Sequence, residues 1–430
     1  MINSFKQLSS SDPYKLHYKS EYDNLIDIDY YDNSVVLDMF DTLASICYCD
    51  FYNKRNEEVF RINHVSVDVV NIDLFNSIKN DLNNLVSFMT NGELWNITFK
   101  KVDSKIINIK KKQMCLFSHD FNSIALLSGG LDALAGASQE LSNKTLFVTY
   151  ATNKVEKNKS NESFKYIKKL NLNSEHVIIP KMQFNKKKQT TQRTRSLVFI
   201  ASALIYADYY KIPFIKIYEN GVMSLNPSFE FRRRVTKTTH PRTLFYINQI
   251  LKKIGLNIKV INPFQFKTKA EVINLIPDKW NDLIKITKTC SKMPGTLAFQ
   301  NRKNSNCCHC GVCAACLLRQ ISMLSSKKDT LDSEYITPKN ISSYAELLRL
   351  EKKYGEDQNK NLKIVQYKFI EKKSLLVYYK EFYDRILDDS ITSYLELSPL
   401  FENSDMLYIE YKKMLIRFSN EVKKYLDIQK

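Results

Sequence analysis

Five consecutive residues, Ser128-Gly129-Gly130-Leu131-Asp132, have the composition of an anion-binding turn. They follow the apolar run Ile124–Leu127, and a helix is expected from about Ala133. Two adjacent glycines leave backbone N–H groups uncovered, so an anion can bind to them and to the positive end of the helix. We therefore predict a phosphate-binding turn, with Ser128 as a hydroxyl donor and Asp132 holding magnesium or orienting a nucleotide. A tight turn with a capping serine is the alternative interpretation.

A run of cysteines forms the second group of residues with a chemical spacing. Cys310, Cys313 and Cys316 follow the pattern C-x-x-C-x-x-C, and Cys290 lies 20 residues upstream of the run. Four thiolates at such spacing can close a tetrahedral site around one ion. We favour structural zinc over an iron–sulfur cluster, although four cysteines alone do not discriminate between them. Three neighbouring residues can replace Cys290 as the fourth ligand: Cys307, Cys308 and His309.

The middle of the chain, residues 121–330, alternates between apolar strand-like runs and helical stretches. This alternation is typical of an α/β fold with a parallel sheet covered by helices on both faces, which binds ligands at the carboxyl ends of its strands. The clearest helix is expected over Leu197–Tyr209, where small and apolar residues recur at helical spacing. The expected strands are Ile124–Leu127, Thr145–Tyr150, Val177–Ile179, Phe214–Tyr218 and Ile258–Ile261.

The two flanking segments predict accessory regions. Residues 1–120 are expected to form an N-terminal α/β or β-rich domain, and residues 331–430 a helical C-terminal region. The helices expected in the C-terminal region are Ser343–Tyr354 and Glu402–Leu426. The strands expected in the N-terminal domain are Ser34–Met39, Val65–Val70 and Trp95–Phe99.

The positive charge of the chain is confined to its middle. The formal net charge of +18 divides into −4 for residues 1–120, +22 for residues 121–330 and zero for residues 331–430. A basic middle segment is expected to bind anions, either nucleotides or nucleic acid. Five of the nine cysteines lie between Cys307 and Cys316, which favours a metal site in a reducing cytosol over a disulfide framework. The chain has no apolar run of about 18 residues and no signal-peptide pattern, so we expect a cytoplasmic protein without membrane contact.

The turn at Ser128–Asp132 resembles the pyrophosphate loop (PP-loop) of the ATP pyrophosphatase superfamily, whose usual form is S-G-G-x-D-S. Here Ala133 stands in place of the last serine. Together, the turn and the cysteine run are similar to the 7-cyano-7-deazaguanine synthase (QueC-like) family, in which an isolated cysteine precedes C-G-x-C-x-x-C-x-x-R. The residues that match this second pattern are Cys290, Cys310, Gly311, Cys313, Cys316 and Arg319. The resemblance covers about residues 120–325 and implies a PP-loop, adenine nucleotide alpha hydrolase-like fold.

The resemblance also implies a set of site residues and three cofactors: ATP, magnesium and zinc. Thr268-Lys269-Ala270-Glu271 resembles the family's Ser-Lys-x-Glu, although T-x-x-E is also a helix capping box. Arg193, ahead of the long apolar helix, resembles the family's Arg-Asn, and Arg193 and Asp132 are expected to be catalytic. The residues expected to bind ATP are Ser128, Gly129, Gly130, Leu131, Asp132 and Lys269. The expected zinc ligands are Cys290, Cys310, Cys313 and Cys316.

The chemistry implied by the resemblance is that of an ATP-dependent carbon–nitrogen ligase. The family adenylates the carboxylate of 7-carboxy-7-deazaguanine, releases pyrophosphate, and goes on to the amide and the nitrile. The family's base-recognition segment is replaced here by Glu219–Asn226, which lacks its aspartates. The two flanking regions look like those of QueC-like proteins of bacterial antiphage defence systems such as Qat. That layout implies transfer of a deazaguanine-type acyl group to an amine, either ammonia or an amine of a partner protein.

Two other functions stay open at this point. The basic middle segment would suit a tRNA-modifying PP-loop enzyme, but we do not expect nucleic acid as the partner, because two flanking regions without excess charge would crowd an RNA. A non-catalytic nucleotide-binding subunit is the other alternative, because of Ala133. A basic cluster, Arg232–Arg234 with Lys237 and Arg242, can clamp phosphates or form a solvated face, and His240 can be an acid–base group or structural.

Overall fold

The computed structural model shows a chain with two compact units. The first unit comprises Met1–Ser128, Glu140–Glu219 and Met223–Pro263, and the second comprises Gly129–Gln139, Asn220–Val222 and Phe264–Lys430. The residues predicted as an N-terminal accessory domain thus belong to the first unit, together with the central sheet. The residues that the structure describes are 30–52, 61–105, 107–108, 120–151, 154–171, 173–180, 193–226, 236–290, 309, 311, 313–335, 381, 383–387, 397 and 404–428.

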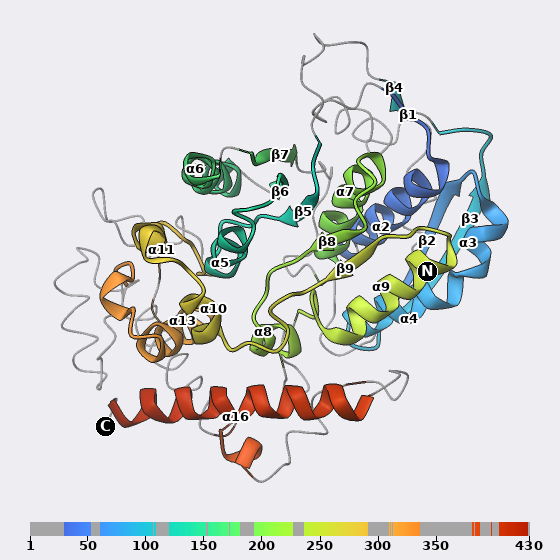
Figure 1. Ribbon diagram of the computed structural model, residues 1–430. Helices are drawn as coiled ribbons and strands as arrows, with labels where there is room; N and C mark the ends of the chain where they lie inside the picture. Colours follow the sequence, from blue (N-terminus) through green and yellow to red (C-terminus); the bar gives the residue numbers. More distant parts are fainter. Residues whose placement is uncertain are drawn as a thin grey trace, which may run out of the picture. The chain divides into compact units, whose positions relative to one another are not determined.

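A parallel sheet of five described strands forms the centre of the first unit (Figure 1). Its order is β7-β6-β5-β8-β9, and every neighbouring pair is parallel. The strands are β5 (Ser123–Leu126), β6 (Thr145–Ala151), β7 (Glu175–Pro180), β8 (Phe214–Lys216) and β9 (Lys259–Ile261). Each lies at a position predicted from the apolar runs, so the predicted α/β class with a parallel sheet is confirmed.

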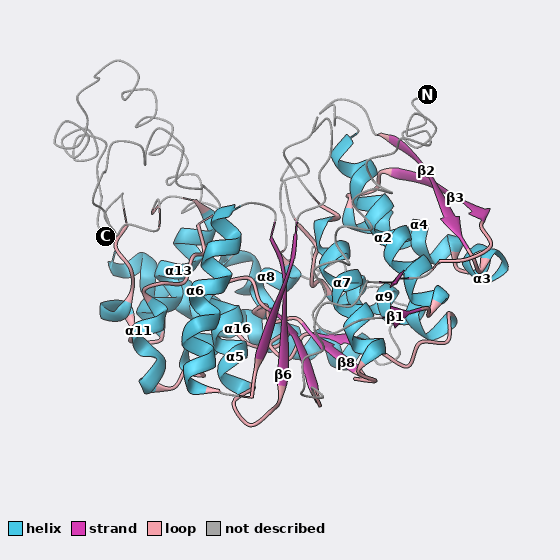
Figure 2. Ribbon diagram, turned by 90° about the horizontal axis from the view of Figure 1, so that it is seen from above, coloured by secondary structure: helices cyan, strands magenta, loops and turns pink. Residues whose placement is uncertain are grey.

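Helices cover both faces of this sheet. Figure 2 shows α6 (Lys154–Leu170) on one side of the strands and α7 (Arg195–Tyr209) on the other. Another helix, α9 (Pro241–Lys253), packs on β9. The chain winds from β5 to β7 in one direction and from β8 to β9 in the other. Ligands of such doubly wound sheets bind where this direction reverses, here between β5 and β8.

A buried carboxylate fastens three of the strands. Glu140 Oε2 accepts hydrogen bonds from Ser123 Oγ of β5 at 2.7 Å and from Thr145 Oγ1 of β6 at 3.2 Å. Its other oxygen accepts from Lys216 Nζ of β8 at 2.7 Å and from the Tyr218 hydroxyl. Burial alone would raise the pKa of Glu140, but these donors hold the pKa below its ordinary value. These hydrogen bonds therefore hold β5, β6 and β8 together through one side chain.

The N-terminal part of the first unit is α/β. A parallel pair of strands, β2 (Ile62–Val69) and β3 (Leu94–Lys101), is joined through α3 (Ile72–Ser77) and α4 (Lys79–Met89). Two short strands, β1 (Tyr30–Tyr31) and β4 (Ile107–Asn108), pair antiparallel. The strands predicted at Val65–Val70 and Trp95–Phe99 are confirmed by β2 and β3.

The strand predicted at Ser34–Met39 is wrong, because these residues begin the helix α2 (Ser34–Tyr52). This helix packs on β2 with one side and on α7 with another. Apolar residues therefore surround it instead of forming one stripe, and the helical period is hidden. In a stretch as short as Ser34–Met39, the apolar pattern of a helix buried on two sides resembles that of a strand.

The second unit is helical in its described residues. Its elements are α5 (Leu131–Gln139), α10 (Lys269–Asn274), η1 (Asp278–Trp280), α11 (Asn281–Ile284), α13 (Ala314–Ser325), η2 (Asp329–Leu331) and α16 (Ser404–Ile428). The short helix α8 (Gly221–Leu225) begins in this unit and ends in the first. Helix α10 packs against α5 and α13, and α13 packs against α16. No described helix is both long and apolar enough to cross a membrane.

The long C-terminal helix α16 confirms the helix predicted at Glu402–Leu426, whereas the one predicted at Ser343–Tyr354 lies outside the described residues. Helix α16 packs close to Gly221. A Cβ atom at Gly221 would lie 2.2 Å from the Gln265 carbonyl oxygen and 2.9 Å from Met414 Cε of α16. Only glycine therefore fits at this position without displacing the backbone at Gln265.

Candidate functional site

The glycine turn joins β5 to α5 as its sequence predicts. Gly129 has φ of +72°, in the left-handed region that glycine adopts without steric cost. The Leu134 N–H donates to the Gly130 carbonyl at 3.0 Å, which starts the helix directly after the glycines. Gly129 is buried, whereas Ser128 is exposed. The turn thus delivers the chain into the N-terminus of a nine-residue helix, the positive end of its dipole.

A buried ion pair lies in the first turn of that helix. Asp132 Oδ1 accepts a hydrogen bond from Lys269 Nζ at 2.5 Å. Asp132 Oδ2 accepts from Asn220 Nδ2 at 2.7 Å and from the Asn220 backbone N–H at 3.3 Å. Asp132 is 6% exposed, Lys269 3% and Asn220 is fully buried. The pair joins three segments of the second unit that are far apart in sequence.

The charge state of Asp132 follows from these contacts. Burial alone would raise its pKa, because a low-dielectric environment disfavours the charged form. The Lys269 charge and the hydrogen bonds from Lys269 and Asn220 outweigh burial and hold the pKa of Asp132 below its ordinary value of 3.8. Asp132 is therefore ionised at neutral pH.

The same contacts bear on the two roles that the sequence predicts for Asp132. Magnesium prefers an octahedral shell of oxygen ligands, usually with several waters and one or two carboxylates. Both oxygens of Asp132 already accept from Lys269 and Asn220, and no second carboxylate joins them among the described contacts. The geometry favours Asp132 as the group that orients Lys269 and Asn220 over Asp132 as a magnesium ligand.

Lys269 owes its position to the local structure of Thr268–Glu271. Thr268 Oγ1 accepts from the Glu271 N–H at 3.2 Å, and the Thr268 N–H donates to Glu271 Oε2 at 2.8 Å. This is a complete capping box at the start of α10. The capping-box interpretation is therefore confirmed, and the capped turn also directs Lys269 toward Asp132.

Asn220 lies in the segment that replaces the family's base-recognition residues, and the sequence alone does not identify it as a partner of Asp132. Asn220 follows β8, and Asp132 follows β5, so both lie after strands that are neighbours at the reversal point of the sheet. That topology was the available signal. It could be used only after the strand order was known.

Arg193 lies in the first unit and contacts the N-terminal elements. Its Nη1 donates to the Thr90 carbonyl at 2.7 Å and lies 3.9 Å from Glu93 Oε1. Its backbone N–H donates to Asp50 Oδ2 at 3.1 Å. These contacts tie the start of α7 to α2 and to the end of α4. A catalytic role for Arg193 stays a prediction.

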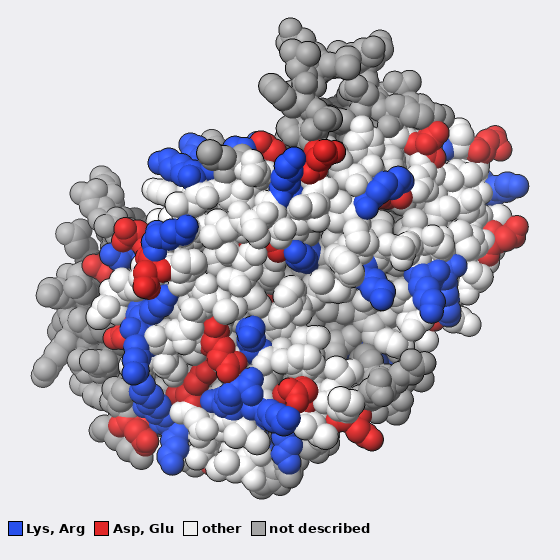
Figure 3. All heavy atoms as spheres, in the orientation of Figure 1, with Lys and Arg blue, Asp and Glu red and all other residues white. Residues whose placement is uncertain are grey.

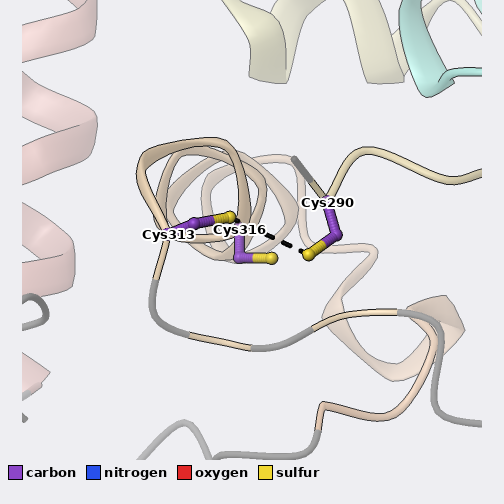
Figure 4. Close-up of side chains that lie close together, drawn as sticks. All are labelled: Cys290, Cys313 and Cys316. Carbon is purple, nitrogen blue, oxygen red and sulfur yellow. Dashed lines mark hydrogen bonds between the residues drawn. The ribbon is translucent and has the colours of Figure 1, made fainter. Parts of the chain in front are cut away.

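Three of the four predicted zinc ligands come together. The sulfur atoms of Cys290, Cys313 and Cys316 all lie within 4.8 Å of one another, and Cys290 Sγ is 4.0 Å from Cys313 Sγ (Figure 4). Thiolates around one tetrahedral zinc lie about 3.8 Å apart, given Zn–S bonds near 2.3 Å. Cys313 and Cys316 flank the start of α13, and Cys290 comes from the segment after α11. The cluster fits a thiophilic metal such as zinc.

The contacts of His309 exclude it as the fourth metal ligand. Its Nε2 accepts from the Thr289 N–H at 3.1 Å, and its Nδ1 is 2.7 Å from Ser333 Oγ. With both ring nitrogens engaged, His309 is not placed to bind a metal. Cys310, the predicted ligand, and the alternatives Cys307 and Cys308 lie outside the described residues.

The described residues of the basic cluster, Lys237 and Arg242, and their neighbour His240 make contacts that stabilise the fold. His240 is fully buried and caps α9, because its Nδ1 accepts from the Arg242 N–H at 3.2 Å. The Lys237 and Arg242 cations lie over the Phe88 ring, at 4.1 and 4.7 Å from its centroid. Arg232–Arg234 lie outside the described residues.

Comparisons of the chain with protein-family models, with curated proteins and with solved structures found no match.

The buried pair yields a prediction about stability. Asp132→Asn should destabilise the protein by about 3–5 kcal/mol, because it leaves the Lys269 ammonium buried without a counter-charge. Adding Lys269→Met to that variant should recover much of the loss, as measured by urea denaturation. Because the pKa of Asp132 is depressed, the difference between the wild type and the double variant should hold at neutral pH and fall only below pH 3.8.

The matched control is Lys413→Met. Lys413 forms an exposed pair with Glu410 on α16, so its loss should change stability by less than about 1 kcal/mol. Equal effects of Asp132→Asn and of the double variant would show that the two charges are not coupled.

The thiolate cluster yields a prediction about metal content. The purified chain should carry about one zinc ion, and Cys313→Ser should lose it, because three thiolates cannot close the site. Elemental analysis measures both. Cys47→Ala, a change at a buried free cysteine of α2, should retain the metal. Iron with a visible charge-transfer band, or a metal-free wild type, would overturn the zinc assignment.

Proposed function

We propose that the protein is an ATP-dependent carbon–nitrogen ligase of the QueC-like, PP-loop type. In this proposal it adenylates the carboxylate of a 7-carboxy-7-deazaguanine-like acid, releases pyrophosphate and passes the acyl group to an amine. The observation that carries the proposal is the pairing, within one compact unit, of a glycine turn backed by Asp132 and Lys269 with a cluster of three cysteines. These are the two motifs of the family, in the family's order.

The glycine turn and Lys269 would hold the β and γ phosphates of ATP. Amides at the start of α5 and the helix dipole favour an anion there, and Lys269 adds a full positive charge at the same helix turn. Asp132 would keep Lys269 aimed at the turn until the anion arrives. Magnesium bound to ATP would neutralise phosphate charge, and zinc would serve a structural role at the thiolates. Catalysis then rests on positioning and on charge stabilisation of the leaving pyrophosphate.

The acid and the acceptor follow from the resemblance and not from a described pocket. Asn220 belongs to the segment that replaces the family's base-recognition residues, and its side chain holds Asp132. The segment thus supports the glycine turn. In this proposal, other residues recognise the deazaguanine. The acceptor is either ammonia or an amine of a partner protein, and the second fits a cytoplasmic role in antiphage defence.

The tRNA-modifying alternative keeps one supporting observation, the net charge of +22 in residues 121–330. Figure 3 shows one face of the molecule, on which acidic side chains lie among the basic ones of the described residues. An extended RNA site would need a continuous basic surface to neutralise successive phosphates. We prefer the ligase proposal because two motifs support it, whereas net charge alone supports the tRNA-modifying alternative.

Incubation with ATP and candidate acids tests this function. AMP and pyrophosphate should form together, only with an acid present, and Lys269→Met should slow them by about 10²–10³-fold, since it removes one cation from the leaving group. Lys285→Met, at an exposed lysine of the same unit, is the matched control and should keep the wild-type rate.

Two other outcomes would contradict the ligase, and a third would contradict its site. Tight ATP binding without AMP formation would leave a non-catalytic nucleotide-binding subunit. Formation of AMP that requires tRNA would favour the RNA-modifying enzyme. Equal rates in Lys269→Met and the wild type would remove the site from the glycine turn.

A further inference from the structure

Arg319 is the most heavily bonded side chain near the thiolate cluster. It is fully buried on α13, one helical turn after Cys316. Its Nε donates to Asp332 Oδ1 at 2.8 Å, and its Nη2 donates to the Ile284 carbonyl at 2.9 Å. Its Nη1 donates to the hydroxyls of Thr287 and Thr289, at 2.8 and 3.0 Å. The guanidinium thus holds the whole segment that leads to Cys290.

A second chain of hydrogen bonds returns to the same segment. The Ser333 N–H donates to Asp332 Oδ1 at 2.9 Å, and Ser333 Oγ is 2.7 Å from His309 Nδ1. His309 Nε2 accepts from the Thr289 N–H at 3.1 Å. Arg319, Asp332, Ser333, His309 and Thr289 therefore form a closed ring. The ring contains Thr289, the residue before Cys290, through its backbone N–H and its hydroxyl, so it fixes the chain beside one of the predicted ligands.

The segment held by Arg319 also touches the glycine turn. The Lys288 N–H donates to the Gly129 carbonyl at 3.2 Å. Lys288 lies between the two threonines that Arg319 holds, and two residues before Cys290. Gly129 is the residue of the turn with positive φ, and its carbonyl belongs to the peptide that joins it to Gly130. One short segment, Thr287–Cys290, is thus shared by the thiolate cluster, Arg319 and the turn.

We propose that Arg319 is a positioning residue that couples the thiolate metal centre to the glycine turn. When a metal binds Cys290, Cys313 and Cys316, it fixes the end of the Thr287–Cys290 segment, and Arg319 transmits that order to Lys288 and hence to Gly129. Loss of the metal frees the segment and loosens the turn. By thermodynamic linkage, an anion held by the turn raises the affinity of the site for the metal by the same factor by which the metal raises the affinity of the turn for the anion.

The coupling goes beyond a structural role for the metal, since it makes metal occupancy a control on the anion-binding turn. It rests on the proposed function only for its effect on ATP. The contacts that carry it involve protein groups alone, and it is measurable without any substrate.

Hydrogen exchange read by mass spectrometry tests this coupling on the zinc-loaded full chain. Arg319→Lys keeps the charge and loses the planar fork, so amides at Lys288 and in Gly129–Leu134 should exchange about tenfold faster than in the wild type. Peptides from α7, in the first unit, should not change. Arg385→Lys is the matched control, because Arg385 pairs with Glu381, four residues earlier in the chain.

A second perturbation keeps the test decisive if Arg319→Lys fails to fold. Chelation of the metal from the wild-type chain should speed exchange in the same two peptides, and inorganic pyrophosphate should raise the fraction of metal that the chain retains at equilibrium against a chromogenic chelator. Faster exchange at Lys288 with no change in Gly129–Leu134 would overturn the coupling. Absence of AMP formation would overturn the ligase and leave this exchange result standing.

Discussion

The buried pair between Asp132 and Lys269 is the interaction on which the second unit depends. A carboxylate and an ammonium lose much hydration when they leave water, so such a pair is stable only with close geometry and with its remaining hydrogen-bond positions filled. Asn220 fills those positions on Asp132. The pair therefore requires α5, α10 and the segment after β8 to meet in one arrangement. A change in any of them leaves a buried charge without its partner.

Helix α16 stabilises two of those three segments. Glu421 Oε1 accepts a hydrogen bond at 2.5 Å from the hydroxyl of Thr268, the residue before Lys269. Met414 lies beside Gly221, the residue after Asn220. Arg417 pairs with Glu271 of the capping box at 2.6 Å. Burial raises the pKa of Glu421 to about 8 and so favours the protonated acid, although the hydrogen bond from Thr268 acts in the opposite direction. The C-terminal helix is therefore part of the support of the candidate site.

The sequence predicts the parts of this protein whose physics is local. Each strand of the five-stranded sheet follows from an apolar run, and the turn at Gly129 and the spacing of Cys313 and Cys316 follow from backbone and ligand geometry. The helix that begins at Ser34 is not visible in the sequence, because its burial on two sides hides the helical period of its apolar residues. Asn220, Asp332 and the role of His309 could not be found, because each acts through a partner distant in sequence. Such partners are set by tertiary packing, which one sequence does not display.

A crystal structure with an ATP analogue that carries a methylene bridge between its α and β phosphates tests the central claim most directly. We expect β-phosphate oxygens about 3 Å from the amides of the glycine turn and from Lys269 Nζ, with Asp132 still bonded to Lys269 and Asn220. Binding of the phosphates away from the turn, or against Asp132 with Lys269 displaced, would contradict the account.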